Sequence, residues 1–374
     1  MKRVGQLVGG AARLTRSGRS GRVGPIGLDI GLESLNLVQL RFGADGSIGL
    51  RASACVHHTP DRDALLAAPA AFKARLAEAL RRQSFAGRRV VTALPAQAVR
   101  ILPVPYNISG GRSDGAAIAQ VLRDRLDSDL SRYVIDYMPV RGDINAPERL
   151  ALVAVAQREA VIAHLELLRK AGMEVLALEI GPSAIKRLIT TLAQPDSREN
   201  QLVINFGETT SYLTVVSGRR LLQDQEVSFG ERAVLGQIAT ALQISHEEAR
   251  VLVGRYGLGV PGARSLPGDD GDVAQTLVEI IKPHLLRLVD EINRVLIYTA
   301  SETHGASVGH IHLLGSLARW RGIEGLLQSM VEIPVGALDD PLGLFAAGVG
   351  DSDRRGAALA IATGLALRGM SGHE

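Results

Sequence analysis

The chain has 374 residues, of which 46% are hydrophobic and 22% are charged, and it contains a single cysteine, Cys55. This composition is typical of a soluble globular protein that is large enough for two or more domains. One cysteine excludes an internal disulfide. The sequence also lacks a run of about 18 apolar residues, which a membrane span would need, and the CxxC or HExxH spacing of a metal site.

The first 23 residues carry much of the positive charge. Six basic residues and no acid lie there: Lys2, Arg3, Arg13, Arg16, Arg19 and Arg22. Because the whole chain has a net charge of +3, residues 24–374 are close to −3. We expect residues 1–23 to be a flexible basic leader in weak electrostatic contact with an anionic membrane. A nucleic-acid partner is disfavoured, since the body of the sequence shows no basic stripe and aromatic residues make up only 3%.

Two stretches, about half a chain apart, predict a strand, a glycine turn and a second strand. Residues 24–41 read GPIGLDIGLESLNLVQLR, with Asp29 at the bend and Gly31 beginning the turn. Residues 202–216 read LVINFGETTSYLTVV, with Asn205 and Gly207 in the equivalent places. A carboxylate that ends a buried strand beside a glycine can hold the metal of a bound phosphate through water. With a third glycine turn in residues 311–322, IHLLGSLARWRG, the order predicts a duplicated nucleotide cleft.

Hydrophobic periodicity and turn signals predict the remaining elements of the first half. We expect strands at 47–56, 89–94 and 174–179, a helix at 61–83 that breaks or begins near Pro69, and a helix at 182–193. Residues 95–172 are expected to form a small α+β insertion, with strands at 99–102, 133–140 and 149–156 and helices at 116–126 and 158–171. Pro103 and Pro105 are expected to stiffen the chain after the first of these strands, and Gly110 and Gly111 to form a flexible loop.

The second half is expected to begin with strands and to continue with helices. The expected strands lie at 202–216, 220–227, 310–314 and near 335; the expected helices lie at 233–242, from 245 onward, 273–300 with a kink at Pro283, 323–330 and 356–366. A mobile Gly- and Pro-rich loop is expected at 257–271.

In this order, the motifs resemble the actin-like fold of hexokinase, the heat-shock chaperone ATPase domain and FtsA, and within it the PilM-like type IV pilus assembly proteins. GLDIGLESLNLVQL is similar to the first phosphate loop, DIGSSSVKLVEL, and LVINFGETTSYLTVVSGRRLLQDQEVSFG to the second. ISHEEAR is similar to the LSLEEAE segment that follows, and IHLLGSLARWRG to the adenosine turn, LxGGGAxLxG. RRVVTALPAQAVRILPVP, VIDYMPV and AGMEVLALEIGPSAIKRLI resemble the subdomain that PilM and FtsA insert.

The resemblance covers residues 24–367 and implies an α/β class with a duplicated actin-like, ribonuclease H-like fold. The expected domains are the leader 1–23, a first actin-like domain 24–200 with the insertion at 95–172, and a second domain 201–374 with a helical subdomain at 230–300. ATP with Mg²⁺ is the implied ligand, and Asp29 would hold the metal through water. The implied nucleotide-site residues are Asp29, Gly31, Ser34, Asn36, Asn205, Gly207, Thr209, Thr210, Ser211, Gly230, Gly315 and Ser316.

Departures from the family pattern change the charge of this cleft. The family's lysine is matched by Asn36 and its second-loop aspartate by Asn205, while Glu33 and Glu208 are added, a change of −2. Like charges ~4 Å apart repel by ~4 kcal/mol at an effective dielectric constant of ~20, or ~3 powers of ten in affinity. We therefore expect a degenerate cleft that binds nucleotide weakly or not at all and does not hydrolyse it.

The function implied by the resemblance is that of a cytoplasmic scaffold, peripheral to the bacterial inner membrane, in the type IV pilus machinery. Its expected partners are the N-terminal cytoplasmic tail of a PilN-like inner-membrane protein and other pilus components. The candidate residues of the groove for the tail, chosen by location, are Val99, Ile101, Leu102, Ile135 and Tyr137. Two alternatives remain: an active actin-like ATPase or small-molecule kinase, with Asp29 as base, and a relative of the cytoplasmic domain of the type II secretion L-like protein. The latter is ranked low because no membrane helix follows.

Overall fold

The computed structural model describes residues 22–43, 45–59, 62–108, 113–126, 129–141, 148–193, 199–259, 269–338, 340–345 and 356–370. Residues 1–21 of the expected leader, the loop at Gly110 and Gly111 and much of the loop at 257–271 lie outside these residues, whereas Val23, the last residue of the expected leader, already belongs to the first strand. The chain divides into two compact units. Unit 1 comprises Met1–Leu192, Pro341–Asp351 and Leu359–Glu374, and unit 2 comprises Ala193–Asp340 and Ser352–Ala358.

Unit 1 is built on a five-stranded sheet with the order β3-β2-β1-β4-β8. Its strands are β1 (Val23–Ile30), β2 (Ser34–Phe42), β3 (Ile48–His57), β4 (Arg89–Ala93) and β8 (Glu174–Glu179). The first three strands pair antiparallel, and β1, β4 and β8 run parallel. The predicted sequence of three strands, helical segment and strand is confirmed, with the helical segment divided at Ala68 into α1 (Arg62–Ala67) and α2 (Pro69–Arg82).

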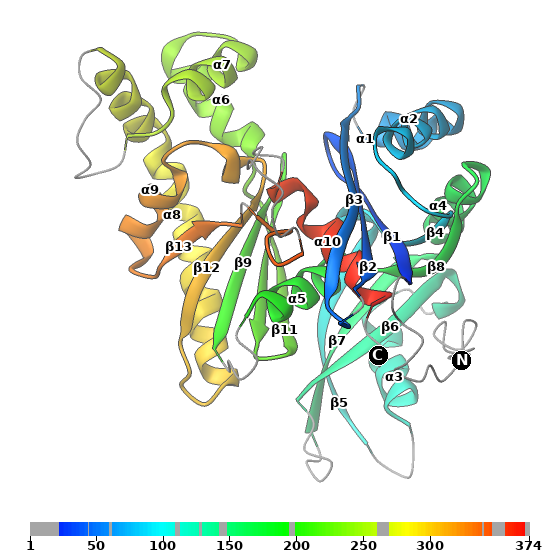
Figure 1. Ribbon diagram of the computed structural model, residues 1–374. Helices are drawn as coiled ribbons and strands as arrows, with labels where there is room; N and C mark the ends of the chain where they lie inside the picture. Colours follow the sequence, from blue (N-terminus) through cyan, green and yellow to red (C-terminus); the bar gives the residue numbers. More distant parts are fainter. Residues whose placement is uncertain are drawn as a thin grey trace. The chain divides into compact units, whose positions relative to one another are not determined.

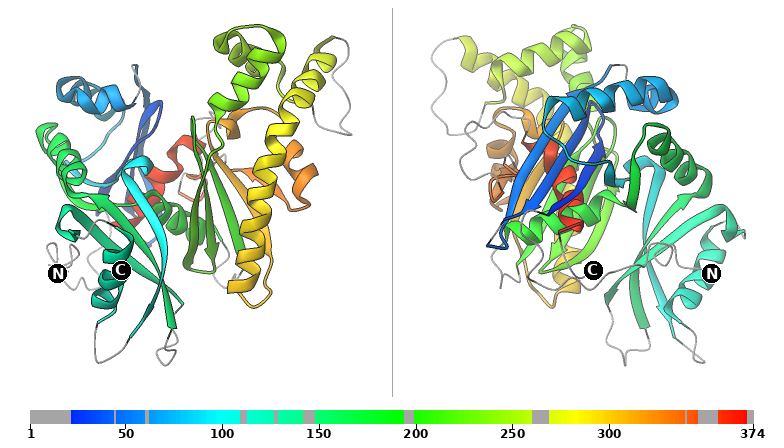
Figure 2. Two further views of the ribbon diagram at one scale, coloured as in Figure 1. Left: turned by 180° about the vertical axis from the view of Figure 1, so that it is seen from behind. Right: turned by 45° about the vertical axis from the view of Figure 1, so that its right-hand side comes forward.

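Alternation along β1 directs side chains to the two faces of this sheet. Ile26 and Leu28 are fully buried in a core with Phe72 of α2 and Leu168 of α4 (Arg158–Lys170). α10 (Ala360–Arg368) packs on the other face beside α5 (Gly181–Leu192), as Figures 1 and 2 show. A Cβ atom at Gly27 would lie 2.0 Å from the carbonyl oxygen of Ala362 in α10. A glycine in β1 therefore lets the last helix approach the strand.

The insertion forms a three-stranded antiparallel sheet of order β5-β7-β6. Its elements are η3 (Ala96–Ala98), β5 (Val99–Asn107), α3 (Asp114–Arg125), η4 (Leu130–Arg132), β6 (Tyr133–Arg141) and β7 (Glu148–Gln157). Helix α3 covers one face of this sheet through a core that includes Val104, Ile118 and Val153. The prediction that β5 ends before Pro103 is wrong. Since β5 is an edge strand, the nitrogen atoms of Pro103 and Pro105 can point away from β7, where no hydrogen bond is needed.

Unit 2 contains a second five-stranded sheet, of order β11-β10-β9-β12-β13. Its strands are β9 (Asn200–Phe206), β10 (Ser211–Ser217), β11 (Arg220–Val227), β12 (Val308–Gly315) and β13 (Val335–Ala337); its helices are α6 (Glu231–Leu242), α7 (His246–Tyr256), α8 (Asp269–Glu302), η5 (Leu317–Arg319) and α9 (Ile323–Val331). The long helix α8 runs along the sheet (Figure 2) and continues through Pro283. Ser245 and Glu248 form a capping box at α7, which agrees with the predicted helix start.

The C-terminal segment differs from the expected domain 201–374. A short 3-10 turn, η6 (Ala357–Leu359), precedes α10, and α10 groups with unit 1. The reason is close packing, because a Cβ atom at Gly364 would lie 2.1 Å from the carbonyl oxygen of Ala184 in α5. In the described part of the chain, no helix has the length and apolarity that a membrane crossing requires.

Candidate functional site

The first glycine turn joins β1 to β2 in unit 1. The N–H of Gly31 donates to the carbonyl oxygen of Ser34 at 2.9 Å, which closes the hairpin. Within it, the hydroxyl of Ser34 donates to Oδ1 of Asn36 at 2.9 Å, and Nδ2 of Asn36 donates to Oδ2 of Asp29 at 3.1 Å. A Cβ atom at Gly31 would lie 3.1 Å from Nδ2 of Asn36. The four residues predicted for this loop, Asp29, Gly31, Ser34 and Asn36, therefore form one hydrogen-bonded group.

Asp29 holds its carboxyl in a poorly hydrated position. Burial raises its pKa to about 6, while the hydrogen bond from Asn36 and the charge of Arg62 act in the opposite direction. The amide of Asn36 thus stands beside Asp29 where the family pattern has a lysine, and it stabilises the carboxylate without adding a charge. Near neutral pH this carboxyl is still mostly ionised, so the raised pKa alone does not prevent it from holding a metal.

Two residues that sequence reasoning did not single out also support the first loop. His58 is buried, and its Nε2 lies 3.1 Å from the carbonyl oxygen of Gly31. Arg62 begins α1, is buried, and places its Nη2 2.7 Å from Oε1 of Gln97. Neither role could be predicted from sequence position, because both residues come from the segment that follows β3 and are brought to the loop by the sheet. Arg62 partly replaces the positive charge that the family lysine would supply.

The second glycine turn, in unit 2, lies against the N-terminus of α6. The N–H groups of Glu231 and Arg232 donate to the carbonyl oxygens of Gly207 and Glu208 at 3.1 and 2.8 Å. Gly230 is the N-cap, and a Cβ atom there would lie 2.4 Å from the carbonyl oxygen of Glu208. Helix N-termini bind anions through unpaired N–H groups. Here, two of those groups are already occupied by the loop.

The side chains of the second turn are also largely engaged within unit 2. The Ser211 hydroxyl is buried and donates to the carbonyl oxygen of Phe229 at 2.6 Å, so this hydroxyl already donates within unit 2, and its place in a nucleotide site stays a prediction. Thr209 and Thr210 have their hydroxyl oxygens 3.5 Å apart at the surface. Glu208 is ion-paired with Arg232. This pair offsets the negative charge that the sequence assigns to Glu208, although an exposed pair is worth about 1 kcal/mol or less.

The third glycine turn packs directly on the second. The N–H of Ser316 donates to the carbonyl oxygen of Phe206 at 2.9 Å, and its hydroxyl donates to that of Gly207 at 3.3 Å. Gly315 has a φ of +85°, and a Cβ atom there would lie 2.0 Å from the same Phe206 oxygen. The glycine is therefore required by the contact between the two turns, which explains its presence without a nucleotide base.

A buried carboxylate lies beside these turns. Glu231 accepts a hydrogen bond from the indole N–H of Trp320 at 3.2 Å, and its other oxygen lies 3.9 Å from Nη2 of Arg250. The protein thus satisfies this carboxylate internally, through residues from η5 and α7. Sequence reasoning missed Glu231, because its partners lie far along the chain.

The five candidate residues for the partner tail lie on two faces of the insertion sheet. Leu102, Ile135 and Tyr137 pack against the core below α3. Val99 and Ile101 of β5 both alternate with Leu102 and belong to the opposite face, where Val99 packs with Leu94, Ala156 and Val161. Their role in binding stays a prediction.

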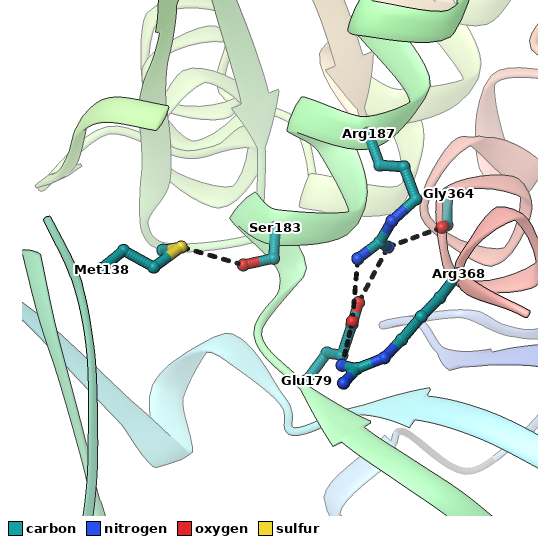
Figure 3. A network of polar contacts seen from close by, with 6 residues as sticks. All are labelled: Met138, Glu179, Ser183, Arg187, Gly364 and Arg368. Atoms are coloured by element: carbon teal, nitrogen blue, oxygen red, sulfur yellow. Dashed lines mark hydrogen bonds and ion pairs between the residues drawn. The ribbon is translucent and has the colours of Figure 1, made fainter. Parts of the chain in front are cut away.

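The face of the insertion sheet opposite α3 carries further apolar side chains beside the five candidate residues. Pro103 and Pro105 are exposed on β5, and Met138 lies half-buried on β6. The Ser183 hydroxyl of α5 lies 3.9 Å from Sδ of Met138, so α5 adjoins this face (Figure 3). We refer to Ile101, Pro103, Pro105 and Met138 as the open face.

These contacts test whether ATP and Mg²⁺ fit the loops. Asp29 and the hydroxyls of Thr209 and Thr210 remain as groups that suit them, but the donors at α6 and Ser211 are occupied internally. The described residues contain no group of three or more His, Cys, Asp or Glu side chains that could hold a metal ion. In unit 2, the N–H groups at α6 and the Ser211 hydroxyl would have to leave their present partners to contact a phosphate.

Comparisons with known proteins agree with the fold. Residues 27–370 match the family described as "Type IV pilus assembly protein PilM". A solved chain from a "PilM-PilN type IV pilus biogenesis complex" is similar, with a TM-score of 0.74 and 24% identity, covering 94% of this chain and 99% of that one. EutJ from Carboxydothermus hydrogenoformans has a TM-score of 0.50 and 14% identity, covering 91% of this chain and 89% of its own. The predicted duplicated actin-like α/β fold is confirmed.

Proposed function

Because the chain belongs to the PilM family of type IV pilus assembly proteins, we propose that it is a binding protein that holds the cytoplasmic N-terminal tail of a PilN-like inner-membrane protein. In this role it links the membrane part of the machine to other pilus components on the cytoplasmic side. The observation that carries the proposal is the similarity to a chain solved as a PilM–PilN complex. The family match over residues 27–370 supports a role in type IV pilus assembly.

The tail binds the open face through side chains rather than by adding a strand to the insertion sheet. Strand addition needs unpaired N–H and C=O groups along a sheet edge. On β5, Pro103 and Pro105 have no N–H, and the carbonyl oxygen of Pro103 accepts from Arg125 at 3.2 Å. On β6, Pro139 has no N–H, and the N–H of Tyr137 donates to Asp136 at 2.9 Å. Both edges are therefore poor templates, whereas the open face presents apolar side chains.

Calorimetry with a synthetic peptide that copies the partner's cytoplasmic tail tests this role. The wild-type chain is expected to bind, and Pro103→Asp and Ile101→Glu are expected to weaken binding. Val251→Asp is the matched control, because Val251 of α7 is an apolar residue that is 61% exposed in unit 2. Absence of binding by the wild-type chain, with and without Mg-ATP, would contradict the proposal. Equal losses of peptide affinity in all three variants would show that the tail does not bind the open face.

The actin-like loops act as architecture and not as a catalytic centre. Three observations support this part of the proposal: Asn205 replaces the family's aspartate, Asn36 replaces its lysine, and the α6 N-terminus donates to its own loop. An attacking water would lack the carboxylate that orients it in phosphoryl transfer. Phosphate release with Mg-ATP is expected to stay at background. Turnover that disappears in Asp29→Ala would establish the alternative, an active actin-like ATPase or kinase.

A further inference from the structure

The sheet of unit 1 has one end that is strongly basic. Seven exposed basic residues lie there, and we call them the basic end: Arg22, Arg41, Arg51, Arg88, Arg89, Arg169 and Lys170. They are scattered along the sequence, so no local run predicts them. The body of the chain, residues 24–374, is close to −3 overall. The fold therefore concentrates positive charge against an acidic average.

Strand direction places these residues together. β1 begins at Val23, its neighbour β4 is parallel to it, and β8 on the far side of β4 is parallel as well, so Arg22, Arg89 and Glu174 lie at the same end. β2 ends at that end, where the N–H of Phe42 donates to the carbonyl oxygen of Arg22 at 3.0 Å. These contacts fix the middle and one side of the basic end.

The outer strands β3 and β8 supply the remaining residues of the basic end. Arg41 pairs with Gly49 at the start of β3, and Arg51 follows two residues later. At the other side, the N–H of Glu174 donates to the carbonyl oxygen of Arg88 at 2.9 Å, and α4 ends just before it with Arg169 and Lys170. With neighbouring strands ~4.8 Å apart, five strands give a front roughly 20 Å wide.

Acidic residues offset only part of this charge. Asp45 lies in the turn after β2, Glu174 begins β8, and Glu166 lies 3.8 Å from Lys170. The net charge of the described residues at this end is therefore +4. Residues 1–21, which precede Arg22 in the sequence, contain five basic residues and no acid.

We propose that the basic end of unit 1 docks on an anionic phospholipid bilayer. The surface is charged and spans the whole width of the sheet, which fits the phosphate headgroups of an anionic membrane. The first phosphate loop lies at the opposite end of β1, roughly 25 Å away at ~3.3 Å per residue. Docking therefore turns Gly31 and its neighbours away from the membrane. This inference goes beyond the proposed function, since it needs no tail peptide.

Co-sedimentation of the full chain with vesicles tests the inference. The vesicles contain either phosphatidylglycerol mixed with phosphatidylcholine or phosphatidylcholine alone. The test variant is Arg41→Gln/Arg88→Gln/Arg89→Gln. The control is Arg100→Gln/Arg123→Gln/Arg132→Gln, which removes the same charge from exposed positions of the insertion, and this subdomain leaves the sheet beyond the far end of β4.

The test variant is expected to lose affinity for anionic vesicles on the order of a hundredfold, since each basic residue near the surface contributes ~1 kcal/mol. The control is expected to lose far less, because salt screens charges beyond ~8 Å. Both variants should keep the wild-type melting temperature and tail-peptide affinity. Equal losses in the two triple variants, no wild-type binding to anionic vesicles, or equal binding to both vesicle types would overturn the proposal. Preferential binding to RNA through the same arginines would do so as well.

Discussion

Replacing Asp29 with asparagine is expected to stabilise the protein above pH 7. The isosteric amide at this position can still accept the hydrogen bond that Asn36 donates at 3.1 Å. What the change removes is the free energy needed to ionise a buried carboxyl. The pKa of Asp29 rises from 3.8 to about 6 in the folded chain. That difference corresponds to about 3 kcal/mol, at ~1.36 kcal/mol per unit.

The pH dependence follows from the direction of the shift. A group whose folded pKa is raised binds its proton more tightly in the folded state, so stability falls as pH rises between the two pKa values. For Asp29 this window runs from 3.8 to about 6. Above it the penalty is complete, and below it the wild-type carboxyl is protonated in both states. Asp29→Asn should therefore raise the free energy of unfolding by about 1–3 kcal/mol at pH 8 and change it little at pH 4.

Thermal and urea unfolding, measured across this pH range, check the expectation. Asp224→Asn is a parallel case in unit 2, since burial raises the pKa of Asp224 to about 7 and its Oδ1 accepts from Thr214 at 2.6 Å. It should show a larger gain that begins in the same pH range, near 3.8, and is complete only above about pH 7. If Asp29→Asn lowered stability equally at pH 5 and pH 8, the carboxylate would be held by an ion pair with Arg62, and the reasoning from burial would be refuted.

Two further predictions concern the packing of α5 and α10. Glu179 accepts hydrogen bonds from Arg187 at 2.9 and 3.0 Å and pairs with Arg368 (Figure 3). Glu179→Gln should therefore lower the free energy of unfolding, measured by thermal unfolding, by about 3–5 kcal/mol, as for a broken buried ion pair. Arg368→Gln should lower it clearly less, because the Arg368 side chain is 42% exposed. Gly364→Ala should lower the free energy of unfolding by about 1–3 kcal/mol through overpacking, since the new Cβ atom would meet Ala184. Gly254→Ala in α7 should raise it by about 1 kcal/mol, because no atom lies within 4 Å of the new Cβ atom. Similar effects of the two changes would contradict this account.

Hydrophobic periodicity and turn signals predicted most elements, because those signals are local. β8 was predicted at its observed bounds, and α5, α6 and α9 were predicted within two residues of theirs. The length of β5 was missed because the pairing of a strand edge is not local: Pro103 and Pro105 are tolerated only where no neighbour follows. The grouping of α10 with unit 1 was missed for a similar reason, since it depends on glycines in β1 and α10 that remove steric barriers.

The candidate site shows the same division between local and distant information. Sequence position was enough to place Asp29 beside Asn36, because a hairpin brings them together. It was not enough to find His58, Arg62 or Glu231, whose partners come from other elements. Motif comparison also counted Glu208 as an added negative charge, whereas the fold supplies Arg232 as its partner. Charge arguments from a motif therefore need the neighbours that only the fold provides.

The hydrogen-bond donors of the second and third glycine turns already have partners within unit 2. In a phosphate-binding loop, N–H groups and hydroxyls wait for a ligand, and each one left unpaired in the empty protein costs free energy. Here the N–H groups of Glu231 and Arg232 and the hydroxyls of Ser211 and Ser316 all donate to backbone carbonyls of unit 2. Nucleotide would have to displace those bonds before gaining its own. The bonds of Ser316 also tie the third turn to the second, so the contacts that occupy these donors hold together two segments that are far apart in the sequence.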